Sequence, residues 1–324
     1  MSADKIAPAL PPVEETLAYE AQQRPRAIGA AVVGGVAGFA GAVLSSVIFG
    51  GGPDEGDGFI SLPEAMESRL NGQTPNEPSL FVRQVDYYGD NVLGLSAAAL
   101  LTALGAAATA LVLIYLYRAV AARMPISRTP LIASVVALVA LPIGHLVQRL
   151  TSWFGASGFS DQTDRSAEAA RDVFQNSFIA AGQIFELLGQ FALSTALVLI
   201  ALNAMRAGLL TRFLGVLGII VGVLAFPLLA ALDQPQLIRM WWLLGIALLL
   251  AGKLRGGLAP AWVTGRAEPW PSQQELREAR ERARGGEPSA PAATSASASS
   301  EPSDAADAFG GESAGQRRKR KKRR

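Results

Sequence analysis

The chain has 324 residues, of which 50% are hydrophobic and 17% charged, and its formal net charge is +2. This composition favours a membrane-embedded body with polar ends over a soluble globule. The absence of cysteine and the single histidine exclude disulfides, iron–sulfur clusters, thiolate zinc sites and an imidazole cage for haem or metal. We therefore expect no cofactor, and only a site made of carboxylates could still bind a metal cation.

Six long apolar stretches indicate transmembrane helices, because about 20 mostly apolar residues cross roughly 30 Å of hydrocarbon. The sixth stretch carries Arg239 and Lys253 near its ends, where long basic side chains can reach the lipid headgroups. The fold class predicted is an all-α polytopic bundle of six transmembrane helices within 27–255. The helices are expected at about 27–49, 92–117, 130–148, 176–204, 212–231 and 236–253.

The segment before the first helix, 1–26, is polar and is predicted to be a mobile cytoplasmic tail. Its glutamates, among them Glu20, are expected on a short exposed helix. Within the first helix, Gly34 and Gly38 form a GxxxG pair, which lets helix backbones approach closely. We interpret this pair as packing inside the bundle, and a dimerisation face that supports a homo- or hetero-oligomer is the alternative.

The connection 50–91 contains eight acidic residues and two arginines. Two short helices are predicted to lie at the membrane surface in this loop, the second with Tyr87 and Tyr88 near the headgroups. Further along the chain, the polar residues 160–175 have a helical pattern that should extend helix 176–204 beyond the membrane.

Basic residues close to the spans predict the orientation, because such residues stay cytoplasmic. They fall before the first helix, in alternate connections, and after the last helix: Arg24, Arg26, Arg118, Arg123, Arg128, Arg206, Arg212, Lys253 and Arg255. Both termini should be cytoplasmic, with the loops 50–91 and 149–175 and the LDQPQ turn outside. The expected location is a bacterial cytoplasmic membrane, with the lipid bilayer as partner.

The C-terminal part divides into a Trp/Pro segment with a short charged helix, 256–285, and a low-complexity tail, 286–324, that should be disordered. The tail ends in QRRKRKKRR, which could bind anionic lipid headgroups at about 1 kcal/mol per residue. No aromatic residue accompanies this basic run, so the sequence does not support specific nucleic-acid recognition.

Polar residues in two of the predicted helices form the candidate site. One stripe of helix 176–204 holds residues at helical spacing: Gln183, Glu186, Gln190 and Ser194. One face of helix 130–148 and its end holds a second set: His145, Gln148 and Arg149. Because these helices are antiparallel and adjacent in sequence, we expect the two sets to touch.

Glu186 is a functional candidate because an unpaired charge at membrane depth costs several kcal/mol. It would bind a proton or cation, with His145 as relay and the glutamines as ligands. In the alternative interpretation, Glu186 is paired with His145 or Arg149, or is protonated, and only ties the helices together. The chain shows no inverted repeat of broken helices, which favours the structural interpretation.

Gly94-Leu95-Ser96-Ala97 has the GxSx form of a rhomboid-type intramembrane serine protease, and His145 is the one possible base. The helix order does not match, and the oxyanion-site residues are missing. Short motifs of this kind also arise often by chance in Ala/Gly-rich helices.

The residues Asn203 to Ala283 include NAMRAGLLTRFLGVLGIIVGVL and PAWVTGRAEPWPSQQELREARERA. Together with the basic end, these stretches resemble an uncharacterised group of actinobacterial-type multi-pass membrane proteins, whose most specific feature is the PAWxxGxAxPWPS pattern. The resemblance implies a membrane location and a helix hairpin, and it implies no activity.

From the sequence we expect a membrane protein without enzymatic activity, acting as a structural, regulatory or partner-binding component. The alternative is a small-solute or proton- or cation-coupled transporter that uses Glu186 and His145. An intramembrane serine hydrolase is the third hypothesis.

Overall fold

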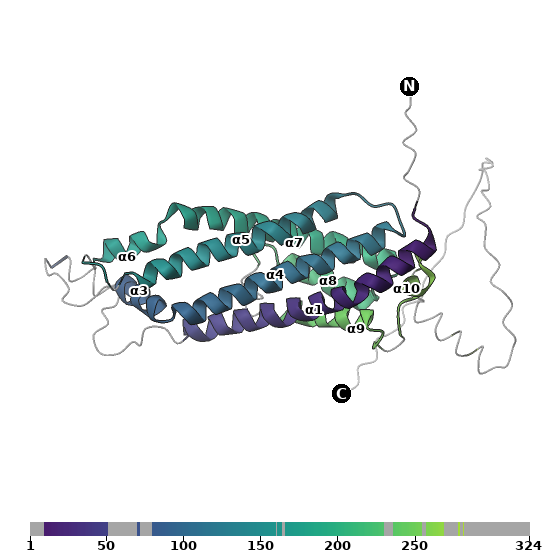
Figure 1. Cartoon of the computed structure of the whole chain (residues 1–324), viewed down its shortest axis with the longest axis horizontal. Coiled ribbons are helices and arrows are strands. Elements are labelled where there is room, and N and C mark those ends of the chain that lie inside the picture. Colours follow the sequence, from purple (N-terminus) through teal and green to yellow (C-terminus); the bar gives the residue numbers. More distant parts are fainter. Residues whose placement is uncertain are drawn as a thin grey trace, which may run out of the picture. The chain divides into compact units, whose positions relative to one another are not determined.

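The computed structural model describes residues 10–50, 70–71, 80–159, 161–163, 166–229, 236–254, 257–268, 278 and 281. The described residues form helices and no strand, as the sequence predicts. By its internal contacts the chain divides into two units, Met1–Pro271 and Ser272–Arg324. All the elements discussed below belong to the first unit (Figure 1).

Four long helices form the main part of this unit: α1 (Val13–Gly50), α4 (Val92–Ala121), α5 (Thr129–Ser157) and α7 (Ser177–Arg206). Among the described residues, 4 helical stretches are long and apolar enough to cross a membrane, and these four helices lie in them. Neighbours in the bundle follow the chain, with α1 against α4, α4 against α5, and α5 against α7.

Glycines allow α1 and α4 to approach closely. A Cβ atom on Gly41 would lie 2.5 Å from Thr102 Oγ1, and one on Gly105 would lie 2.5 Å from Gly38 Cα. Gly34 likewise faces the Thr109 backbone of α4. The GxxxG face of α1 therefore packs inside the bundle, as the packing interpretation expects.

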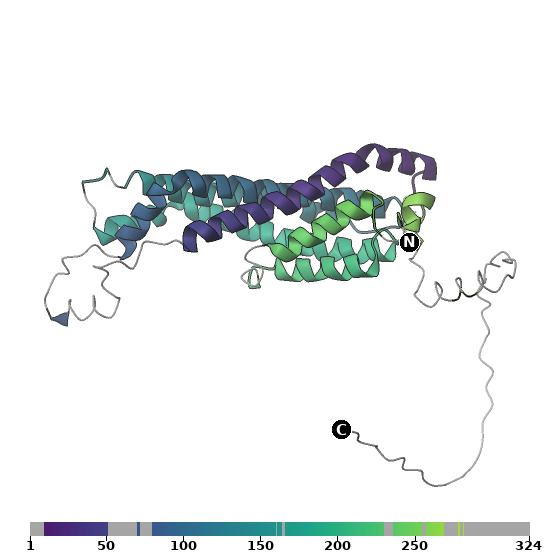
Figure 2. The same ribbon diagram turned by 90° about the horizontal axis from the view of Figure 1, so that it is seen from below.

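The last two apolar helices are shorter than predicted. α8 (Arg212–Leu224) has 13 residues and α9 (Leu237–Leu250) has 14, so each is about 20 Å long, against roughly 30 Å of hydrocarbon. α8 ends before Pro227, which cannot continue a helix hydrogen-bond ladder. Figure 2 shows α8 and α9 beside only part of the length of α1. The expected spans 212–231 and 236–253 are thus not formed at full length.

At one end of the bundle, two short helices pack on the end of α5: α3 (Leu80–Asp90) and α6 (Ala167–Phe174). Val85, Phe159 and Ala170 are buried together there. The Tyr87 hydroxyl donates to the Ile48 carbonyl of α1 at 2.5 Å. α6 does not extend α7 directly, because Asn176 caps a new helix by accepting from the Phe178 backbone amide.

The other end is closed by α10 (Pro260–Thr264), which follows α9. Trp262 is 2% exposed, stacks on Tyr115 with ring centroids 5.8 Å apart, and donates from Nε1 to the Leu209 carbonyl. Arg123 lies over the Trp262 ring and donates to the Glu20 carboxylate from Nη1 and Nη2.

This end differs from the expectation for 1–26. α1 already begins at Val13, and Glu20 is 2% exposed instead of lying on an exposed helix. Glu20 is buried because it forms an ion pair with Arg123. The Arg123 guanidinium also donates to the Ala261 carbonyl at 2.7 Å.

Several sequence expectations lie outside the described residues. They are the first nine residues, most of the acidic loop 50–91, the turn at 230–235, most of the charged helix after 271, and the tail 286–324.

Candidate functional site

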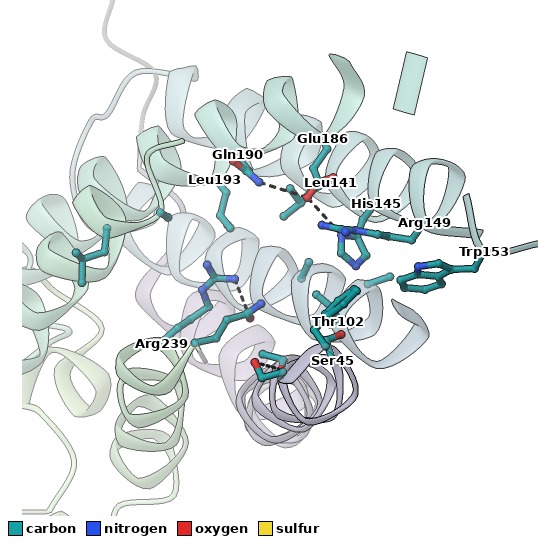
Figure 3. Close-up of a pocket in the computed structure, with 18 residues that line it drawn as sticks. Ser45, Thr102, Leu141, His145, Arg149, Trp153, Glu186, Gln190, Leu193 and Arg239 are labelled. Atoms are coloured by element: carbon teal, nitrogen blue, oxygen red, sulfur yellow. Dashed lines mark hydrogen bonds and ion pairs between the residues drawn. The ribbon is translucent and has the colours of Figure 1, made fainter. Parts of the chain in front are cut away.

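A polar cavity of about 290 Å³ lies where the α8–α9 pair ends, between the four long helices (Figure 3). This is the size of a small solute site, because pockets for drug-sized ligands span roughly 300 to 1,000 Å³. Its ionisable lining residues are His145, Arg149, Glu186 and Arg239. Its hydroxyl and amide lining residues are Ser45, Ser46, Thr102, Gln190 and Gln236.

Glu186 of α7 meets His145 of α5 on one wall of this cavity. His145 Nδ1 lies 3.3 Å from Glu186 Oε1 and donates to it when the carboxylate is ionised. Gln190 Nε2 donates to the same oxygen at 3.4 Å. The side chains of His145 and Glu186 are 16% and 17% exposed, and Arg149 interacts favourably with the carboxylate charge. The contact expected between the two polar sets is therefore present.

Small residues make this contact possible, because α5 and α7 pack with almost no side chain between their backbones. A Cβ atom on Gly182 would lie 2.7 Å from the Gln148 backbone nitrogen, and one on Gly189 would lie 2.5 Å from that of Leu141. A Cβ atom on Gly144 would clash with the Glu186 backbone nitrogen. The glycines thus hold His145 and Glu186 at hydrogen-bond range.

Arg239 approaches the cavity from a separate wall (Figure 3). It stands in the first turn of α9, where its Nη1 donates to Gln236 Oε1 at 3.2 Å. The backbone of Gln236 has a left-handed φ of 54° as α9 begins. The sequence places Arg239 near headgroups, but the short α9 begins beside the cavity, so Arg239 faces polar groups of other helices. The basic residue in the first turn of a short helix was the signal that could have identified Arg239 as a site residue.

A second cavity of about 280 Å³ lies towards α3 and α6. The described lining residues carry one charged side chain, Arg149, among amides and hydroxyls such as Gln84, Gln183 and Ser152. Phe49, Arg149 and Trp153 line both cavities. We call the first the inner cavity and the second the outer cavity.

The predicted site residues do not all line the same cavity. Glu186, His145, Gln190 and Arg149 line the inner cavity, whereas Gln148, Gln183 and again Arg149 line the outer cavity. Ser194 belongs to neither, because its hydroxyl donates to the Gly222 carbonyl of α8 at 2.7 Å. Helical spacing identified the stripe on α7, but only the packing of α8 shows where the stripe leaves the cavity.

The pairing of Ser96 with His145 that a hydrolase needs is not formed. Ser96 Oγ is buried and has no hydrogen-bond partner in the described part of the chain, while His145 Nδ1 bonds Glu186. No group of three or more His, Asp or Glu side chains that could hold a metal ion occurs among the described residues.

No family model, curated protein or solved structure matches the chain. The functional argument therefore rests on the two cavities and on the charges that line them.

Proposed function

We propose that the protein is a multi-pass protein of a bacterial cytoplasmic membrane, with both termini cytoplasmic, that binds a small hydrophilic solute in the inner cavity and mediates its transport. One observation carries the proposal: a cavity lined by a carboxylate, an imidazole and two guanidinium groups lies between helices that are long and apolar enough to cross a membrane. Ionisable groups at membrane depth are costly unless they serve a pathway or pair with one another.

The geometry supports solute binding because the polar groups come from different helices and face a shared space. Glu186 and His145 belong to α7 and α5, Arg239 belongs to α9, and Ser45 and Thr102 belong to α1 and α4. A solute held there would lie among side chains from these five helices, so binding would be coupled to their relative positions.

A second function has its own supporting observation. Glu186 Oε1 is already approached by His145 and Gln190 within the chain, so the group could serve only to tie α5 to α7. In that case the protein is a non-catalytic structural or partner-binding membrane component.

Thermal unfolding of the detergent-purified protein with a panel of small solutes separates the two functions. The panel contains acetate, inorganic phosphate, sulfate, glycine, ammonium and neutral sugars, each tested across a concentration series. A bound solute at about 100 times its Kd should stabilise the folded protein by about 2.7 kcal/mol. We expect E186Q and R239Q to remove the stabilisation by a solute that binds the inner cavity.

The matched control is Thr195→Val, which changes an exposed residue of α7 outside both cavities. A Tm shift that persists in E186Q and R239Q would place binding elsewhere. If no solute shifts the Tm and E186Q unfolds at a much lower temperature than T195V, the structural function is favoured.

A further inference from the structure

The wall between the two cavities consists of few side chains. Trp153 is 3% exposed and packs into a cluster with Leu95 and Ala99, so it forms a fixed side of this wall. Phe49 stands in the last turn of α1, is 39% exposed, and touches the Tyr88 ring edge to face at 5.5 Å. Arg149 lies one helical turn before Trp153 on α5. Of the three residues that line both cavities, Phe49 and Arg149 are less buried than Trp153.

The opposite end of the inner cavity offers no comparable opening. Towards α10 the bundle is filled by large side chains that are at most 1% exposed, including Leu116, Leu197 and Trp242. Beyond them, Trp262 and the Glu20–Arg123 pair close the end of the bundle. Within the described residues, the outer cavity is thus the polar space that adjoins the inner one.

Arg149 gives this passage a charge. It is the one charged side chain among the described residues that line the outer cavity. Its Nε is buried and has no hydrogen-bond partner among the described residues. A buried donor left in this way costs roughly 1 to 3 kcal/mol, so a movement of Arg149 that brings Nε into the passage would let an oxygen atom of an anion or a neutral solute satisfy it. A cation would meet a fixed positive charge in a poorly hydrated constriction, which is how arginine excludes cations from membrane pores.

We propose that the solute reaches the inner cavity from the α3–α6 end through a constriction of Phe49, Arg149 and Trp153, and that Arg149 selects anionic and neutral solutes over cations. The proposal rests on the proposed function for its solute. The charge selection itself follows from the constriction and can be measured without any bound solute.

The chain has no cysteine, so single cysteines report access directly. Ser45→Cys places a thiol in the inner cavity and Ser152→Cys places one in the outer cavity. Gly158→Cys and Thr264→Cys, both at exposed positions, mark the α3–α6 end and the α10 end. The probes are two methanethiosulfonates, one with a sulfonate and one with a trimethylammonium group, added to membrane vesicles of either orientation. Each rate is divided by that of the same reagent with a small free thiol.

We expect Ser45→Cys to react only from the side on which Gly158→Cys reacts, and at least about tenfold faster with the sulfonate reagent. R149Q should remove this preference and R149K should keep it. Phe49→Ala should speed both reagents at Ser45→Cys while leaving Ser152→Cys unchanged. The rate at Gly158→Cys serves as the folding control in every background.

Three results would overturn the proposal. They are equal normalised rates for the two reagents at Ser45→Cys, a preference that survives R149Q, and reaction from the side marked by Thr264→Cys. A Ser45→Cys thiol that stays unreactive even with Phe49→Ala would also overturn it, because no passage would then exist. Charge selection without any solute-induced Tm shift would count against the proposed function alone.

Discussion

Two glutamates of the described bundle pair with a basic side chain, and their surroundings differ. Glu20 is buried, and Arg123 donates to its carboxylate from Nη1 and Nη2 while also donating to the Ala261 carbonyl. Glu186 is held by longer bonds, of 3.3 and 3.4 Å, and borders the inner cavity. The first pair fixes the structure, whereas the second leaves carboxylate surface open to a solute.

The Glu20–Arg123 pair should therefore dominate stability at the α10 end. Either E20Q or R123M alone leaves a buried group without its partner and should lower the free energy of unfolding by about 3 to 5 kcal/mol. The double variant E20L/R123M removes both charges and should recover most of the loss. Chemical unfolding of the purified protein in detergent measures all three. Additive losses in the double variant would show that the pair is not coupled.

At this scale the sequence predicted one pair and missed the other. His145 and Glu186 stand on two adjacent helices with regular polar spacing, so helix geometry alone suggested their contact. Arg123 looked like an ordinary cytoplasmic arginine, and its partner lies 103 positions away in sequence. No local pattern joins them, because the pair depends on where α10 places Trp262.

Among the elements, the α5–α7 pair sets the geometry of the site through its glycines. Gly182→Ala should push the helices apart and destabilise the protein by about 1 to 3 kcal/mol, as overpacked cores do. Gly29→Ala is the matched control, because a Cβ atom there meets nothing within 4 Å, and it should be neutral or slightly stabilising. Thermal unfolding compares the two variants, and similar losses in both would contradict the packing role of Gly182.

The lengths of the elements were predicted less well than their existence. The apolar stretches that hold α1, α4, α5 and α7 were found from composition, since each is long and uninterrupted. The apolar runs of α8 and α9 are nearly as long in sequence, but α8 ends at Leu224, before Pro227, while α9 begins only after the left-handed Gln236 and ends at Leu250. The inner cavity lies beside the point where they stop, so hydropathy alone could not reveal it.

For the whole molecule, the orientation remains a prediction from the positive-inside rule. In right-side-out vesicles Gly158→Cys should react with an impermeant thiol reagent and Thr264→Cys should react only after the membrane is opened. The reverse pattern would mean that both termini lie outside, and reaction of both cysteines in intact vesicles would contradict an even number of crossings.

The half-length of α8 and α9 also affects how the bundle fits its lipids. These two helices add to the cross-section of the bundle near α10 but not near α3, where the four long helices stand without them. In a bilayer, such a bundle would have unequal cross-sections in the two leaflets. Changes in leaflet tension or membrane curvature would therefore act directly on the boundary of the inner cavity.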